Sequence, residues 1–449
     1  MFLANERGEL QKLLEDRVER GDNGAVIRRV ERSQVRPSKQ LVEVLGSLLE
    51  GNDEFVLIDE QKTAFEMIRE RVRSVRPNER VVLLIRGGPG TGKSVIAVNA
   101  LVALLADGFN VRFVTKNAAP RAVFRERLRG RRSSVEISNL FASSDSFHGI
   151  EPDSYDVLLV DEAHRLVEKS GFYKNLGVNQ VGEIIAASPV TVFFIDESQL
   201  VTWRDIGTTD EIRAWATKHR ATVEEYKLEV QFRCAGSSEY LEWLDVTLGI
   251  SARETPDLAM CEYDFRIIES PSELRDMILD LEKTNGRSRL VAGYCWQWVS
   301  RNDSQAVDIA FPGTDFAMKW NLEADGSGWL IAPHSVREVG CIHTCQGLEN
   351  DYMGVIIGPD LAVSDGQLIG RPEFRAKHDK SLQGFKAALK SGETGAQEKA
   401  DRLIRNTYRT LMTRGMRGTF VYCTDPQVAD YLRSALADAG YNSPASAGV

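Results

Sequence analysis

Short apolar segments alternate with helical segments along most of this chain. The candidate strands of the first half are residues 81–85, 111–115, 157–160 and 190–195. The stretch from Lys93 to Ala106 is apolar at helical spacing and is followed by Asp107-Gly108, a typical end of a helix. Such alternation predicts a parallel sheet that is covered on both faces and binds ligands at the carboxyl ends of its strands.

A second region of the same kind runs from about residue 228 to residue 435. Its candidate strands lie near residues 265–268, 289–292, 328–332, 353–357 and 419–423. We therefore predict the α/β class, with two tandem lobes that are each built on a parallel sheet. A chain of 449 residues is long enough for two such lobes.

The domain boundaries that we predict follow from these two regions. Residues 55–226 would form the first lobe and residues 227–440 the second, with an exposed helical or mobile insertion near 370–400. Residues 1–54 are too short for a catalytic domain, so we expect a helical N-terminal extension. Residues 441–449 are rich in Ser, Ala and Gly, and we expect a flexible tail.

The residues between the first candidate strand and its helix form a complete phosphate-binding loop. The loop consists of Gly87, Gly88, Pro89, Gly90, Thr91, Gly92, Lys93 and Ser94. Glycines allow a tight turn whose N–H groups point at phosphate oxygens, and the helix N-terminus adds its positive dipole end. We expect Lys93 to reach the β- and γ-phosphates of a nucleoside triphosphate and Ser94 to bind Mg²⁺. ATP and Mg²⁺ are therefore the predicted cofactors.

Acidic and amide side chains follow two further strands of the first region. The strand at 157–160 ends in Asp161-Glu162, where Asp161 is expected to hold Mg²⁺ through water and Glu162 to deprotonate an attacking water. The strand at 190–195 is followed by a segment that ends in Gln199, which we expect to sense the γ-phosphate. Because these strands are parallel, the three side chains would meet at one edge of the sheet.

Composition and charge narrow the class of protein. The chain carries 43% hydrophobic and 27% charged residues, which is ordinary for a globular protein, and it shows neither a membrane span nor a secretory signal. Six scattered cysteines fit a reducing cytoplasm. A net charge of −9 argues against coating nucleic acid non-specifically. The arginine-rich window 112–132, which includes Arg121, forms either a local basic groove or a solvated helix face.

Taken in order, the motifs resemble those of superfamily 1 helicases. Their amino-acid sequences are similar to those of the Schlafen-type DNA/RNA helicase domain of bacteria. The segments that carry the resemblance are the phosphate loop, residues 161–165, and residues 57–61, 115–117, 196–199, 228–233, 342–349 and 408–415. The resemblance covers roughly residues 55–435. It implies two RecA-like lobes and hydrolysis of ATP in the cleft between them.

The resemblance also implies roles for individual residues. Gln61 would contact the adenine base, Gly347 and Glu349 would approach the nucleotide, and Arg233 and Arg414 would act as arginine fingers on the γ-phosphate. An arginine supplied across the cleft makes hydrolysis depend on closure of the lobes. The segments that would grip the nucleic-acid strand contribute Thr115, Lys116, Asn117 and Thr344.

One departure from the family pattern concerns Trp203 and Arg204, which follow Gln199 one residue sooner than in the best-known members. Trp203 either stacks on a base or packs under its own loop. Trp296 and Trp298 have the alternation of core or lobe-interface residues. The short intervals between motifs leave no room for a large duplex-splitting domain.

These observations leave two functions open. The first is an ATPase that moves on, remodels or unwinds single-stranded DNA or RNA as a minimal two-lobe motor. The second is an ATP-driven conformational switch that regulates a partner protein or effector with little or no unwinding. A small-molecule kinase would fit the phosphate loop but would leave the later motifs unexplained.

Overall fold

The computed structural model describes residue 57 and residues 59–116, 140–171, 176–230, 234–285, 287–303, 305–321, 329, 333–345, 350–377 and 379–442. The chain divides into two compact units, Met1–Arg36 and Pro37–Val449, and all of the described residues belong to the second. The predicted extension at 1–54 lies outside the described residues, as does the predicted tail beyond residue 442.

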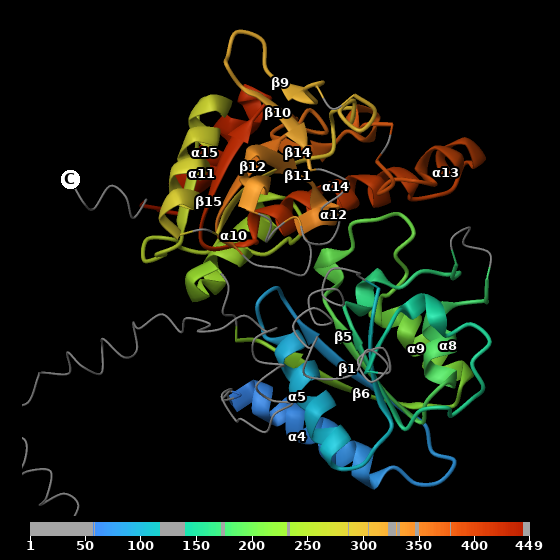
Figure 1. Ribbon diagram of the computed structural model, residues 1–449. Helices are drawn as coiled ribbons and strands as arrows, with labels where there is room; N and C mark the ends of the chain where they lie inside the picture. Colours follow the sequence, from blue (N-terminus) through green and yellow to red (C-terminus); the bar gives the residue numbers. More distant parts are fainter. Residues whose placement is uncertain are drawn as a thin grey trace, which may run out of the picture. The chain divides into compact units, whose positions relative to one another are not determined.

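The first sheet holds the early strands in parallel. Its strands are β1 (Val81–Gly87), β2 (Val111–Thr115), β3 (Phe141–Ala142), β4 (Val157–Asp161), β5 (Val190–Ile195) and β6 (Thr222–Leu228). They run in the spatial order β3-β2-β4-β5-β1-β6, and the recorded pairings are parallel (Figure 1). Their carboxyl ends therefore lie along one edge.

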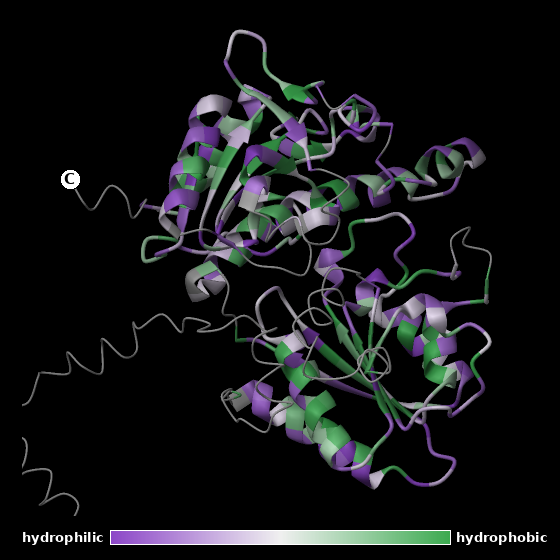
Figure 2. Ribbon diagram, viewed as in Figure 1, coloured by the Kyte–Doolittle hydropathy of each residue, from purple (hydrophilic) through white to green (hydrophobic). Residues whose placement is uncertain are grey.

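Alternation along β1 explains how helices cover both faces of this sheet. Val81, Leu83 and Ile85 lie in the apolar core that includes α4 (Asp59–Ser74) and α5 (Lys93–Ala106). Val82 and Leu84 lie in the core on the other face, with α8 (Gln180–Ala186) and α9 (Thr209–Lys218). Figure 2 shows the hydrophobic colour concentrated in these strands and in the helix sides that face them. Burial on both faces is typical of a parallel sheet.

The second sheet collects the later strands. They are β7 (Asp264–Ile267), β8 (Ser288–Ala292), β9 (Ile309–Ala310), β10 (Ala317–Trp320), β11 (Glu338–Gly340), β12 (Asn350–Ile357) and β15 (Gly415–Cys423). Their spatial order is β7-β15-β12-β8-β11-β10-β9, parallel except where β9 pairs with β10. A separate hairpin joins β13 (Leu361–Ser364) to β14 (Gln367–Gly370).

Helices also cover both faces of the second sheet. They are α10 (Ser238–Thr247), α11 (Pro271–Asn285), α12 (Ile342–Cys345), α14 (Ala396–Met412) and α15 (Pro426–Asp438). Helix α13 (Phe385–Ser391) packs against α14 instead. Leu290 faces the core that α11 completes, whereas Val291 faces the core of α10, α14 and α15. We call β1–β6 with their helices the first lobe, and β7–β15 with theirs the second lobe.

The predicted fold class is confirmed. The four strands predicted in the first half are present, and four of those predicted in the second half correspond to β7, β8, β12 and β15. The predicted strand at 328–332 lies almost wholly outside the described residues. Strand β6 was not predicted, and it carries the first sheet to Leu228. The boundary between the lobes stays a prediction.

Candidate nucleotide-binding and hydrolysis site

The phosphate-binding loop joins the carboxyl end of β1 to the first turn of α5. Gly92 caps α5 with a φ of 85°, in the left-handed region that favours glycine. A Cβ at this position would lie 2.2 Å from the Gln61 amide nitrogen, which itself donates a 3.2 Å hydrogen bond to the Thr91 carbonyl. The left-handed backbone therefore favours glycine here, and a side chain at this position would also displace the Gln61 amide.

Lys93 lies over this loop, and its side chain curls back toward the end of β1. Its ammonium donates 2.7 Å hydrogen bonds to the carbonyl oxygens of Gly87 and Gly88. Only 8% of Lys93 is exposed, so the charge is held within the loop. A Cβ at Gly88 would meet no atom within 4 Å. The Thr91 hydroxyl donates a 3.1 Å hydrogen bond to the Gly88 carbonyl. Pro89 and Gly90 complete the turn, with Gly90 at a φ of 80°.

Ser94 and Asp161 meet at the foot of the loop. The Ser94 hydroxyl donates a 2.7 Å hydrogen bond to Asp161 Oδ2 at the tip of β4. Burial raises the pKa of Asp161 to about 6, helped by the neighbouring Glu162 charge and opposed by Ser94 and Lys93. A hydroxyl beside a carboxylate is the hard oxygen donor set that Mg²⁺ prefers, so these two residues fit a magnesium ion.

Glu162 takes a special backbone conformation next to Asp161. Its φ of 54° places it in the left-handed region, where it caps the short 3₁₀ turn of residues 163–165. The buried His164 places Nε2 2.9 Å from Glu162 Oε2. Burial alone would raise the pKa of Glu162, but His164, Arg414 and Lys93 together hold that pKa below its usual range. Glu162 is thus an ionised carboxylate beside the phosphate loop.

Gln199 links the first lobe to the second. It ends the 3₁₀ turn of residues 197–199 that follows β5, and its amide nitrogen donates to Asp196 Oδ2 at 2.7 Å. Arg414, which lies between α14 and β15, donates from Nη2 to Gln199 Oε1 at 2.8 Å. Arg414 is 1% exposed, and its charge lowers the pKa of Glu162. The structure therefore brings Arg414 to the same edge as the phosphate loop.

Three buried residues at this edge had no predicted role. Asp196 lies at the tip of β5; burial would raise its pKa, but Lys93, Arg409 and His164 lower it overall. Arg409, on α14, donates from Nη2 to an Asp245 oxygen at 2.9 Å. A strand-tip aspartate placed like Asp161 was a usable signal for Asp196. His164 lies between Ala163 and Arg165, and nothing in this local sequence marks its contact with Glu162.

Several predicted site residues lie outside the described residues. They are Asn117, Arg121, Arg233, Gly347 and Glu349. Their roles stay predictions. Gln61 is described, and its recorded side-chain contact is with the loop backbone at Thr91. Contact of Gln61 with a base likewise stays a prediction.

The described residues predicted to grip a strand make contacts within the chain. Lys116 pairs with Asp145 at 2.7 Å, and Thr115 is buried at the end of β2. The Thr344 hydroxyl, on α12, donates to the Cys341 carbonyl at 2.9 Å. Arg204 is exposed.

The sequence leaves Trp203 either to stack on a base or to pack under its own loop, and in the structure its ring contacts the second lobe. Trp203 packs against Phe385, with ring centroids 5.8 Å apart. Trp296 and Trp298 pack against the core on the α11 face of the second sheet, as their alternation suggested.

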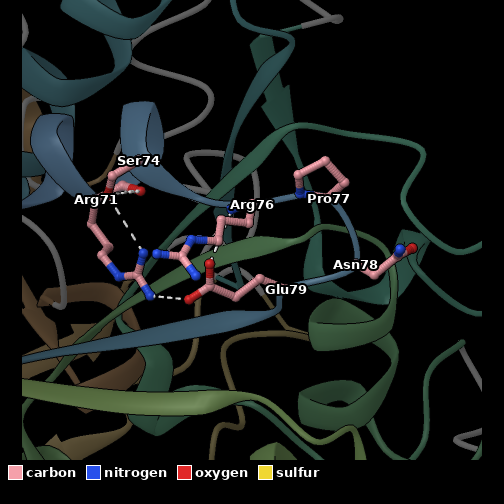
Figure 3. Close-up of a pocket in the computed structure, with 6 residues that line it drawn as sticks. All are labelled: Arg71, Ser74, Arg76, Pro77, Asn78 and Glu79. Carbon is pink, nitrogen blue, oxygen red and sulfur yellow. Dashed lines mark hydrogen bonds and ion pairs between the residues drawn. The ribbon is translucent and has the colours of Figure 1, made fainter.

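An open pocket of about 680 Å³ lies elsewhere on the first lobe. Its lining residues, shown in Figure 3, are Arg71, Ser74, Arg76, Pro77, Asn78 and Glu79. They connect the end of α4 to the start of β1, which is the end of that strand opposite to the phosphate loop. Arg71 and Glu79 pair with each other across it. This pocket is therefore separate from the nucleotide edge.

Within the part of the chain that the structure describes, no helix has the length and apolar character to cross a membrane.

The chain is similar to several known proteins. An uncharacterized protein of the yeast Saccharomyces cerevisiae is 25% identical over 427 residues, covering 82% of this chain and 89% of the yeast protein, so a similar chain occurs outside bacteria. Among solved structures, Pif1 helicase from Candida albicans gives a TM-score of 0.34 at 11% identity, covering 85% of this chain and 99% of that one. AMPPCP-bound DnaA from Aquifex aeolicus gives 0.24 at 16% identity, covering 46% of this chain and 56% of that one.

The sequence profile described as Schlafen group 3, DNA/RNA helicase domain, matches residues 80–425. That range includes the phosphate loop, both strand tips and Arg414. The chain belongs to the Schlafen group 3 DNA/RNA helicase domain family.

Proposed function

We propose that this protein is a Mg²⁺-dependent ATPase that couples hydrolysis to lobe closure and to movement on, or remodelling of, a nucleic-acid strand. The observation that carries the proposal is the buried hydrogen bond from Arg414 to Gln199. It joins a cation of the second lobe to the edge that holds the phosphate loop, Asp161 and Glu162. A motor needs such a link, because hydrolysis must depend on the relative position of the lobes.

The first lobe supplies the groups that bind ATP. Lys93, now held by carbonyls of the loop, would exchange them for the β- and γ-phosphate oxygens. Ser94 and Asp161 would hold Mg²⁺, which when bound neutralises the charge that develops on the phosphate oxygens. Gln61, packed on the loop, would lie beside the base, with Gly347 and Glu349 of the second lobe approaching the nucleotide.

Glu162 is the general base in this proposal. A carboxylate whose pKa is lowered by His164, Arg414 and Lys93 is ionised at neutral pH and can accept the proton of an attacking water. Gln199 would orient the γ-phosphate, and Arg414 would stabilise its equatorial charge. Arg233 is proposed as a second finger from its place in the sequence motif.

Single-stranded DNA or RNA is the proposed polymer. Membership of a DNA/RNA helicase domain family supports it. The residues predicted to contact the strand are Thr115, Lys116, Asn117, Arg121, Trp203, Arg204 and Thr344.

A second function is favoured by a specific observation. Lys116 is neutralised by Asp145, and Trp203 is covered by second-lobe side chains, so two of these groups are engaged within the chain. A switch that regulates a partner protein, with little or no unwinding, needs the ATP site and the lobe link but not these contacts.

One experiment separates the two functions. The rate of ATP hydrolysis is measured with single-stranded DNA, single-stranded RNA, duplex DNA and no polymer, each at two salt concentrations. A motor predicts stimulation by a single strand that weakens as salt rises, because phosphate contacts release counterions. A partner-regulating switch predicts the same rate in all four conditions. Absence of hydrolysis in every condition would refute both.

A further inference from the structure

The loop that follows Gln199 is attached to the second lobe at two backbone positions. The N–H of Trp203 donates a 2.6 Å hydrogen bond to the carbonyl oxygen of Ser381. The side-chain amide of Asn406, on α14, donates a 2.9 Å hydrogen bond to the carbonyl oxygen of Leu200. Both contacts lie within a few residues of Gln199, which accepts from Arg414. Positions 200 and 203 are therefore fixed to the lobe that supplies the arginine.

The indole of Trp203 is also occupied by second-lobe side chains. Its ring is edge-to-face with Phe385 of α13, and the Lys399 ammonium lies 4.4 Å from its centroid. A Cβ on Gly384 would lie 2.6 Å from Trp203 Cδ1, and Gly384 has a φ of 120° that side chains rarely adopt. The cation over the ring and the close approach of the Gly384 backbone are independent stabilising contacts.

The segment that receives Trp203 is itself anchored. Ser381 donates from its backbone N–H and its hydroxyl to the two Asp379 oxygens, at 2.8 and 2.6 Å. Asp379 pairs with Arg375 at 3.0 Å, and Arg375 pairs with Asp360 at 2.7 Å. The side chains of this charged trio are at most 4% exposed. The exposed helical or mobile insertion predicted near 370–400 carries exposed residues on α13 and α14, whereas its segment from Arg375 to Ser381 is fixed by buried charges.

We propose that Trp203 is a positioning residue for hydrolysis. Trp203 contacts Ser381, Phe385 and Lys399 of the second lobe. These contacts fix the loop that follows Gln199, so that Gln199 stays in position to accept the hydrogen bond from Arg414. This inference rests on the proposed ATPase function and concerns how that site is assembled. It assigns to the indole the task of joining the lobes, in place of the base stacking that the sequence motif implied.

The two assignments predict different consequences for the same substitution. A base platform contributes to strand affinity, and its loss leaves hydrolysis without polymer unchanged. A positioning residue sets the geometry of Gln199 and Arg414 whether or not a strand is present. Misplacement of about 1 Å can lower a rate by about 10²-fold.

The main test measures ATP hydrolysis without polymer in Trp203→Ala and Trp203→Phe. We expect Trp203→Ala to lower kcat about ten- to a hundredfold with KM for ATP within about twofold, because ground-state binding groups are untouched. Trp203→Phe, which keeps an aromatic ring against Phe385 and Lys399, should restore most of the rate. An unchanged polymer-free kcat in Trp203→Ala overturns the inference, whatever happens to strand affinity.

A second variant covers the case in which Trp203→Ala does not fold. Lys399→Gln removes the cation over the indole from an exposed position, and Lys390→Gln, exposed on α13, is its matched control. Hydrogen exchange of residues 200–206 should be faster in Lys399→Gln than in wild type or Lys390→Gln. Equal exchange in all three overturns the inference. This readout does not need catalysis, so a wild type that hydrolyses no ATP refutes the proposed function and still leaves the contact testable.

Discussion

Replacing Arg414 by alanine removes the cation that the second lobe brings to the phosphate-loop edge. In the structure the guanidinium is 1% exposed, donates to Gln199 Oε1 at 2.8 Å and lowers the pKa of Glu162. The substitution therefore acts on two groups at once. It leaves Gln199 Oε1 without its donor, and it raises the pKa of Glu162 toward its ordinary value.

The magnitude follows from where this charge acts. An arginine that stabilises the equatorial oxygens of the transferred phosphoryl group contributes about 10³–10⁵ in rate. Arg414 donates to Gln199, and its proposed charge acts mainly on the phosphoryl group in the transition state, so ATP binding in the ground state should change little. We expect kcat to fall by about three orders of magnitude or more, with affinity for a non-hydrolysable ATP analogue within about fivefold of wild type.

Steady-state kinetics and analogue binding test this expectation together. Arg417→Ala is the matched control, because Arg417 is exposed on β15 only three residues along the chain. Arg414→Lys should not restore the rate, since a point ammonium cannot reproduce the planar fork of the guanidinium. A kcat for Arg414→Ala within tenfold of wild type, or one no lower than that of Arg417→Ala, contradicts the lobe-bridging mechanism.

Three further substitutions probe the first lobe. Lys93→Ala should abolish hydrolysis and weaken Mg·ATP binding, because Lys93 is the cation held within the loop; wild-type turnover in this variant rules out the site. Glu162→Gln should keep ATP binding but lower kcat by about 10²–10⁴-fold, since an amide cannot accept the proton; a kcat within a few-fold of wild type excludes Glu162 as the base. Gly92→Ala should lower the melting temperature and ATP affinity, because φ is 85° and a Cβ would lie 2.2 Å from the Gln61 amide, at a cost of about 1–2 kcal/mol for the backbone alone. Unchanged melting and binding in Gly92→Ala contradict the left-handed backbone conformation of the loop at Gly92.

The first lobe was largely predictable because its signals are local. An apolar run, a glycine loop and a helix lie next to one another in the sequence, and the loop residues contact each other directly. Asp161 was predictable for the same reason, since a carboxylate at the end of a buried strand must lie at the ligand edge of a parallel sheet. Strand β6 was missed because it lies at the edge of the sheet, where a strand needs fewer apolar residues. Thr222, Glu225 and Lys227 of this strand are exposed.

Contacts between the lobes were predictable only through the family resemblance. Nothing local marks Arg414 as the partner of Gln199, since the two lie 215 positions apart. The sequence alone did not decide whether Trp203 stacks on a base or packs within the chain. Its contact with Lys399 depends on how α14 packs against the loop that follows β5. His164 gave no signal, because only the folded chain shows its ring beside Glu162.

Hydrolysis of ATP by purified wild type and Lys93→Ala, assayed side by side with Mg²⁺ in the presence and absence of a single-stranded oligonucleotide, tests the central claim most directly. We expect turnover in wild type that rises with the oligonucleotide and none above background in Lys93→Ala. Equal rates in the two proteins, or no turnover in wild type under either condition, would contradict it.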